Sequence, residues 1–289
     1  MHGPVRVGDI TVTAEMRAAI NGVLDQGRFS EGWNVHCFEE HWARYVGTQH
    51  AVAVSSGTAA LIVAIRALQE TRPELATRRK VITTPLTYIA DSNAIALCGM
   101  EPVYVDIDPD TFGLRIDLIE QLLFEQGPEE FGIILPVHLM GYPVNMPALG
   151  KLAYTYGIPI LEDGSQAHGA KLGGAKVGRW GDLSVFSFYI AHNIQVGEFG
   201  AVNTDDPGLA RVVRQLKANG RACDCPQCIR HTGQCPRQGN ERDPRFDHVR
   251  IGYNFKPTEW SGAIAEVQLL HADEILARLH LTADTGGSE

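Results

Sequence analysis

The feature that most constrains this chain is an alternation of short apolar segments with segments whose apolar residues recur at helical spacing. Helical patterns separate the apolar segments 51–54, 80–84, 102–106, 133–137 and 158–161. Repeated strand and helix patterns of this kind predict an α/β fold, in which a mostly parallel sheet is covered by helices on both faces. Ligands of such sheets bind beyond the carboxyl ends of the strands.

The rest of the chain adds four elements and a loop to this pattern. We expect helices over 11–26 and 34–46, a buried strand over 185–189, and a helix from 257 to about 279. Between them, residues 222–250 are dominated by Cys, Pro, Gly, Arg and Asp, which predicts a loop. We therefore expect a large α/β domain over 1–250, including this loop, and a separate helical segment over 251–289.

Charge and hydropathy exclude some classes of function. The net charge of -9 argues against nonspecific binding to nucleic acid, which needs a surplus of Lys and Arg. No apolar run reaches the 18 or more residues typical of a membrane span, and the first residues lack the basic and apolar regions of a signal peptide. We expect a cytoplasmic protein that contacts neither nucleic acid nor membrane.

Polar residues follow the predicted strands at 56–58, 87–88, 138, 163–168 and 187–192, and we expect them to converge on one site. The turn at 55–58 opens a helix, and free backbone N–H groups at a helix start favour a phosphate. Many α/β proteins have such turns, so this signal alone leaves an ordinary turn equally open.

His192 lies in a glycine-flanked polar turn directly after the strand at 185–189. A histidine in such a turn is more often structural than catalytic. Imidazole titrates near neutrality, however, so the residue type also suits proton transfer.

Several segments, in this order, resemble the sugar aminotransferase and 3-dehydratase family, also called DegT/DnrJ/EryC1/StrS. Its members are fold-type-I pyridoxal-phosphate enzymes that act on nucleotide-linked keto sugars. The matching segments are Gly27-Arg-Phe-Ser-Glu-Gly32, Ser56-Gly-Thr-Ala-Ala-Leu61, Val105-Asp-Ile-Asp-Pro109, Glu162-Asp-Gly-Ser-Gln-Ala-His-Gly169, Phe186-Ser-Phe188 and Gly252-Tyr-Asn-Phe-Lys256. The resemblance covers almost the whole chain and implies an aspartate-aminotransferase-like fold.

The resemblance implies a role for each residue that matches a family motif. Two groups would hold the cofactor phosphate: Gly57 with Thr58, and Ser187. Others would contact the pyridine ring: Tyr88 by stacking, Asp163 at the ring nitrogen and Gln166 near the 3-hydroxyl. Asn254 matches a residue that reaches the phosphate of the neighbouring subunit, which implies a homodimer.

Two of these residues have ordinary alternatives. Tyr88 lies at a predicted helix start and could instead pack on the core. The acidic pair at 162–163 could instead be a helix-start signal.

At position 192 the chain departs from most of the family, which has a lysine that binds the cofactor covalently. Histidine cannot form that bond, so pyridoxamine or pyridoxal phosphate would be held noncovalently. The sugar 3-dehydratase branch has the same exchange, which implies that His192 is the base in C3 dehydration of a nucleotide 4-keto-6-deoxyhexose, a step of deoxysugar biosynthesis. An aminotransferase homologue with another residue in place of lysine, or an inactive truncated paralogue with a structural role, stays open.

The cysteines fall into two groups. Cys37 and Cys98 are expected to be small buried hydrophobes. The others form the pattern Cys223-x-Cys225-x2-Cys228-x6-Cys235, and four cysteines in one cytosolic loop predict metal ligands more than disulfides. Both zinc and iron–sulfur fit thiolates.

The segment Gly220-Arg-Ala-Cys-Asp-Cys225 resembles the CDP-4-keto-6-deoxyglucose 3-dehydrase subgroup. That resemblance favours a [2Fe–2S] cluster over zinc or unligated thiols, and it implies a flavin or iron–sulfur reductase as partner. Two further departures from the family follow. Phe199 replaces a glycine and is expected to add bulk beside the cofactor, and 251–289 would be only the interdomain helix and the start of a smaller carboxy-terminal domain.

Overall fold

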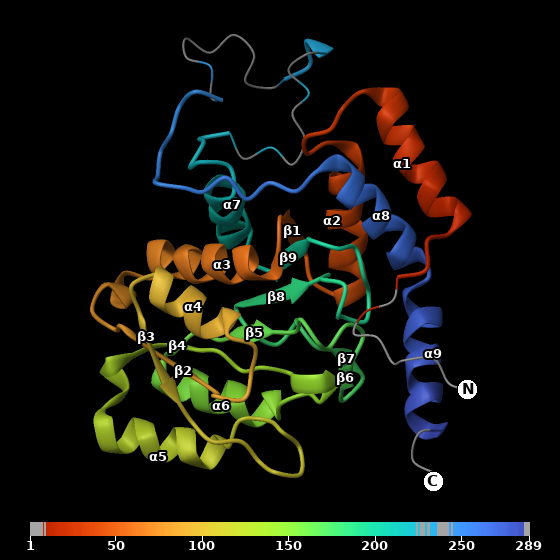
Figure 1. Ribbon diagram of the computed structural model, residues 1–289. Coiled ribbons are helices and arrows are strands. Elements are labelled where there is room, and N and C mark those ends of the chain that lie inside the picture. The colour runs from red at the N-terminus through yellow and green to blue at the C-terminus, as the bar shows by residue number, and fades with distance from the viewer. Residues whose placement is uncertain are drawn as a thin grey trace.

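The computed structural model describes residues 8, 10–223, 225, 229, 232–235, 243 and 245–285. A central sheet runs through the molecule, and helices cover it on both sides (Figure 1). Its strands are β1 (His50–Val54), β2 (Lys80–Thr83), β3 (Glu101–Tyr104), β4 (Phe131–Ile134), β5 (Leu161–Asp163), β8 (Leu183–Ser187) and β9 (Gly200–Thr204), and β6 (Lys171–Leu172) and β7 (Ala175–Lys176) form a separate hairpin. The helices are α1 (Ala14–Gln26), α2 (Trp33–Val46), α3 (Gly57–Thr71), α4 (Ala90–Leu97), α5 (Ile116–Gln126), α6 (Met146–Tyr156), α7 (Pro207–Leu216), α8 (Glu259–Leu270) and α9 (Ala272–Thr285), with short 3-10 turns η1 (Pro73–Ala76), η2 (Pro128–Glu130) and η3 (Leu139–Gly141).

The strands pair in two groups, β1-β9-β8-β5 and β3-β2-β4. Parallel bridges between Ile134 and Ile160 and between Val137 and Asp163 join β4 to the β5 segment, so the two groups form one continuous sheet. Only β9 runs antiparallel to both of its neighbours, β1 and β8, while the pairs from β8 to β3 are parallel. The predicted mostly parallel α/β sheet is confirmed.

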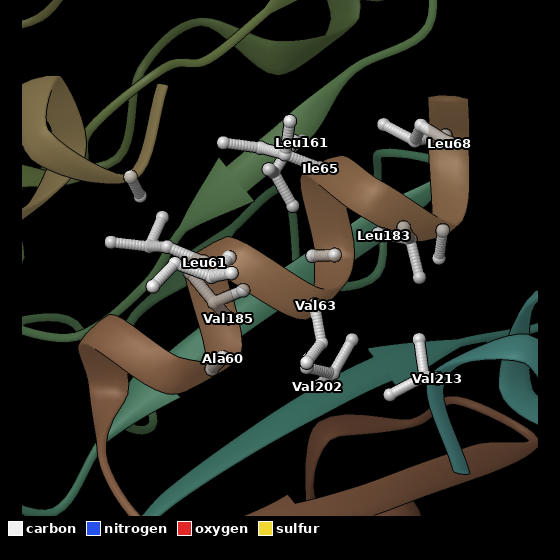
Figure 2. Close-up of a cluster of buried hydrophobic side chains, with 14 of the residues drawn as sticks. Ala60, Leu61, Val63, Ile65, Leu68, Leu161, Leu183, Val185, Val202 and Val213 are labelled. Atoms are coloured by element: carbon white, nitrogen blue, oxygen red, sulfur yellow. The ribbon is translucent and has the colours of Figure 1, made fainter. Parts of the chain in front are cut away.

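Alternating strand residues supply two cores, one on each face of the sheet. On one face α3, α4 and α7 cover Val54, Val185 and Val202. Figure 2 shows side chains of α3 lying against those of β5, β8 and β9. On the opposite face, aromatic residues of α2 pack on Phe186 of β8, and α5 and α6 cover β2 and β4. Because Val185 and Phe186 are neighbours that face opposite cores, β8 is fixed in register at the centre of the molecule.

The predicted elements match the observed ones with several differences. The strand predicted over 158–161 is β5, which begins at Leu161, and the strands β6, β7 and β9 and the helix α7 were not predicted. The single helix predicted over 257–279 is wrong. It is two helices, α8 and α9, that meet at His271. The bend buries Ala272 in the core beneath α2 and brings the His271 ring to 2.9 Å from a carboxylate oxygen of Glu15.

Within 251–289, α8 packs against α1 and α2. The division into domains 1–250 and 251–289 stays a prediction. No helix within the described ranges is long and apolar enough to cross a membrane.

Candidate functional site

A cavity of about 810 Å³ opens where β1, β5 and β8 end. This is the edge of the sheet at which ligands of α/β proteins bind. Its described lining residues are Ser56, Gly57, Thr58, Leu61, Thr87, Tyr88, Ala90, Asp91, Met140, Asp163, Ser165, Gln166, Ser187, Tyr189, Ala191, His192, Asn193 and Glu198. Segments far apart in sequence therefore meet around one space.

The structure brings together all but one of the residues predicted to bind or act on a cofactor. The residues that line the cavity are Gly57, Thr58, Tyr88, Asp163, Gln166, Ser187 and His192. Asn254 is exposed and is not among the lining residues. Its segment runs beside the turn that enters α3, because the Ser55 N–H donates to the Phe255 carbonyl at 2.8 Å.

The start of α3 is held in place by contacts that only small residues allow. Ser56 caps the helix, and its Oγ accepts from the Ala59 N–H at 3.1 Å. A Cβ at Gly57 would lie 2.5 Å from the Ser187 Cβ, and one at Gly200 would lie 2.3 Å from the Ser56 carbonyl oxygen. The turn, the end of β8 and the start of β9 thus form a tight cradle, into which a helix N-terminus presents N–H groups suited to a phosphate.

Gly57→Ala is expected to weaken the binding of a phosphate-bearing cofactor by about tenfold or more, because the added Cβ forces the turn away from Ser187. Titration of pyridoxamine phosphate by absorbance measures the effect. Gly22→Ala is the matched control, since a Cβ there meets nothing. An unchanged dissociation constant for Gly57→Ala contradicts the assignment of this turn as the phosphate cradle.

Asp163 and Glu162 are neighbours on β5 that face in opposite directions. Asp163 is 8% exposed and lines the cavity, and its Oδ1 accepts from the Ser165 N–H at 2.8 Å. Glu162 is fully buried and accepts backbone N–H groups from Trp180 and Gly181, each at 2.7 Å. No α-helix begins at this pair among the described residues, so the helix-start alternative is wrong.

Glu162→Gln is expected to lower the free energy of unfolding by about 2–4 kcal/mol, since an amide offers N–H donors where the carboxylate accepts several hydrogen bonds. The urea midpoint measures the loss. The exposed Glu120→Gln on α5 is the control. Equal midpoints for the two variants contradict an anchoring role for Glu162.

His192 lies in the turn after β8, where its backbone N–H donates to the Tyr189 carbonyl at 2.9 Å. Its half-buried ring is edge-on to those of Tyr189 and His168, each with centroids 6.3 Å away. Burial lowers the pKa of His192, and the nearby charge of Asp163 opposes this shift. The ring is therefore neutral at pH 7 and able to accept a proton.

Two other histidines that were expected at the site lie outside it. His138 is fully buried between Glu162 and the Val144 N–H. His168 is buried against Phe186 and Phe188, and burial is the main cause that lowers its pKa to about 3. Neither lines the cavity, so the expectation that they converge on it is wrong. His168 instead supports the turn of His192, because its Nδ1 accepts from the Ile194 N–H at 3.3 Å.

Two predictions about bulky residues are decided by their exposure. Tyr88 is 72% exposed at the cavity, so the alternative in which it packs on the core is wrong. Phe199 is fully buried, with its ring centroid 5.0 Å from that of Phe38, and it does not line the cavity. The expectation of added bulk beside the cofactor is wrong because the ring points into the core beneath α2.

Comparison with known proteins identifies the family. Residues 11–285 match the DegT/DnrJ/EryC1/StrS aminotransferase family. The chain belongs to this family. The predicted fold-type-I architecture is thereby confirmed, and a pyridoxal or pyridoxamine phosphate cofactor is supported.

Solved structures similar to this chain include both aminotransferases and a dehydratase. PseC from Helicobacter pylori, an aminotransferase of pseudoaminic acid biosynthesis, is 26% identical with a TM-score of 0.79, and the match covers 93% of this chain and 66% of PseC. GDP-4-keto-6-deoxymannose-3-dehydratase, ColD, is 27% identical with a TM-score of 0.81, covering 92% of this chain and 68% of ColD. DesV from S. venezuelae, in complex with a ketimine intermediate, is 35% identical with a TM-score of 0.75, covering 90% of this chain and 62% of DesV.

The cavity fits the cofactor that this family implies. A cradle of small residues at the start of α3 offers N–H groups to a phosphate, and the buried carboxylate of Asp163 faces the same space. Gln166, whose Oε1 accepts from the Met140 N–H at 2.8 Å, lies between the segments that follow β4 and β5. A planar ring with a phosphate at one end and a protonated nitrogen at the other matches this arrangement.

The structure describes only part of the predicted cysteine cluster. Cys223, Cys225 and Cys235 are half-buried, and Cys228 lies outside the described residues. Within the described part of the chain, no group of three or more His, Cys, Asp or Glu could hold a metal. The [2Fe–2S] cluster therefore stays a prediction, and we derive no step through it. Elsewhere, Cys98 is buried as expected and Cys37 is half-buried.

The cavity wall also contains a buried carboxyl group that was not predicted, that of Asp91. It lies in the first turn of α4 and is 1% exposed. An acidic residue in a first helical turn ordinarily indicates a surface charge that complements the helix dipole, so nothing in the sequence marked it.

Proposed function

We propose that this chain is a pyridoxamine-phosphate-dependent 3-dehydratase of a nucleotide-linked 4-keto-6-deoxyhexose that holds its cofactor noncovalently. The observation that carries the proposal is the identity of the residue at position 192. His192 lines the cavity where most of the family has a lysine, and none of the other described lining residues is a lysine. The dehydratase ColD among the similar structures supports the reaction class.

Each element of the cavity has one task in this proposal. Pyridoxamine phosphate, when bound, supplies an amine that condenses with a ketone and a ring that takes up electrons. The N–H groups at the start of α3 bind the phosphate, and the carboxylate of Asp163 accepts a hydrogen bond from the pyridine nitrogen. With the cofactor bound, the neutral ring of His192 would take up the proton released at the C4' carbon and return it to the departing C3 hydroxyl, which would leave as water.

The choice between dehydration and amination follows from the side chain at position 192. A lysine amine can displace the product from the cofactor and release an amino sugar. Imidazole retains the base but lacks a primary amine, so this route to an amino sugar is closed. His192 thus favours loss of the C3 hydroxyl.

The proposal also includes a second subunit, a metal cluster and a reductase. Asn254 is exposed beside the α3 turn, which supports its assignment to the neighbouring active site of a homodimer. We further propose that Cys223, Cys225, Cys228 and Cys235 hold a [2Fe–2S] cluster, with zinc as the alternative, and that a flavin or iron–sulfur reductase supplies electrons. Iron and sulfide analysis of anaerobically purified protein tests this part separately, and zinc or no metal contradicts it.

The test of the proposed function combines the purified protein with pyridoxamine phosphate, a CDP- or TDP-4-keto-6-deoxyhexose and a reductase. Mass spectrometry is expected to show a product that has lost the 3-hydroxyl. With glutamate as amino donor in place of the reductase, an amino sugar as product would favour the aminotransferase alternative. A folded protein that binds no cofactor would favour the structural paralogue.

A further inference from the structure

Asp91 is a buried carboxyl group in the cavity wall that the proposed chemistry does not use. Its Oδ2 accepts from the Thr87 hydroxyl at 2.6 Å, while no N–H or hydroxyl group of the described residues donates to its Oδ1. It lines the same cavity as Asp163 and lies within hydrogen-bonding reach of that carboxyl group. One oxygen of a side chain that is only 1% exposed therefore receives no hydrogen bond from a donor in the described residues.

The surroundings offer no cation to this pair of carboxyl groups. Among the described residues that line the cavity there is no Lys or Arg, and the other titratable side chains are Tyr88, Tyr189, His192 and Glu198. Burial, and next the charge of Asp163, raise the pKa of Asp91 well above its ordinary value. Two ionised carboxylates in contact repel, whereas a single proton between them makes a hydrogen bond.

The proton belongs to Asp91 rather than Asp163. Asp163 already accepts the Ser165 N–H at 2.8 Å, so its Oδ1 acts as an acceptor. Asp91 receives only the Thr87 hydroxyl and is the more deeply buried of the two, at 1% exposed against 8%. A carboxyl that is kept neutral at pH 7 can act as a hydrogen-bond donor.

We propose that Asp91 is a positioning residue that stays protonated and donates its carboxyl hydrogen to Asp163, orienting that carboxylate toward the pyridine nitrogen of the cofactor. The inference rests on the proposed cofactor site but not on dehydration. It assigns to Asp91 no contact with the reacting atoms.

Two variants distinguish a role of Asp91 as a hydrogen-bond donor from a role that depends on its negative charge. Asp91→Asn keeps an N–H donor of similar shape, whereas Asp91→Ala removes it. We expect Asp91→Asn to bind pyridoxamine phosphate within about threefold of the unmodified protein, and Asp91→Ala to bind about tenfold more weakly, as for loss of one buried hydrogen bond. Asn93→Ala, an exposed change in the same helix, controls for damage to α4.

A second readout uses the cofactor-free protein. A carboxyl group whose pKa is higher in the folded than in the unfolded state stabilises the protein at low pH. This stabilisation is lost as the pH rises from the unfolded-state pKa through the folded-state pKa. Asp91→Asn removes this titration. The urea midpoint of the variant minus that of the unmodified protein should therefore increase as the pH is raised from 4 to 8. A midpoint difference that stays constant over that range, or Asp91→Asn binding the cofactor as weakly as Asp91→Ala, overturns the inference. Failure to dehydrate a sugar while these results hold would sink only the proposed function.

Discussion

His192→Asn is expected to lower the dehydration rate by about 10²–10⁴, because asparagine keeps the size and polarity of the side chain but cannot accept a proton. The dissociation constant of pyridoxamine phosphate should change little, since His192 is assigned no contact with the phosphate or the pyridine nitrogen. Single-turnover formation of the 3-deoxy product, measured with saturating cofactor, separates the two effects.

His192→Asn is also expected to change how the dehydration rate depends on pH. Burial lowers the pKa of His192 from its ordinary value of about 6.5, so its neutral form predominates at pH 7 and is lost as the pH falls below that value. The rate of the unmodified protein should therefore decline on the acid side of that pH, and His192→Asn should lack this decline. His50→Asn, a change outside the cavity, is the control. An unaltered rate and acid limb in His192→Asn would contradict the role of His192 as base.

Asp163→Asn is expected to raise the dissociation constant of pyridoxamine phosphate by about 10- to 100-fold, the equivalent of one charge-assisted hydrogen bond in a buried site. The amide oxygen can still accept the Ser165 N–H, so the local turn should be retained. The rate should fall as well, because the ring loses the charge that keeps its nitrogen protonated.

The measurement is an absorbance titration, with circular dichroism to check folding. Asp106→Asn serves as a matched control, since this residue follows β3 and does not line the cavity. Wild-type affinity in Asp163→Asn would show that another group contacts the pyridine nitrogen.

The strands of the sheet and its cavity were predictable because their signals are local. Apolar segments end in polar residues, and parallel strands bring those ends to one edge, so Gly57, Asp163 and His192 could be expected together. The strand β9 was missed because its small residues (Gly-Ala-Val-Asn-Thr) carry no apolar run. The helix α7 does carry local signals, since Asp206 caps it and a proline begins it, so it was predictable from the sequence.

The sequence indicated which residues follow a strand, but not whether their side chains point into the cavity or into the core. His138 and His168 follow strands just as Asp163 does, yet both are buried away from the cavity against Glu162 and the aromatic core. Phe199 was expected beside the cofactor and points into the core instead. Asp91 was missed because its partner, Asp163, is 72 positions away in sequence, and only the fold brings the two together.

Noncovalent binding of the cofactor can be tested by asking whether any lysine of the protein becomes attached to it. The protein is incubated with pyridoxal phosphate, reduced with borohydride, denatured and examined by intact-mass and peptide mass spectrometry. If the cofactor is held noncovalently, we expect no labelled lysine in the unmodified protein, a label at position 192 in His192→Lys, and none at position 193 in the matched control Asn193→Lys. A stoichiometric label on any lysine of the unmodified protein would contradict noncovalent binding.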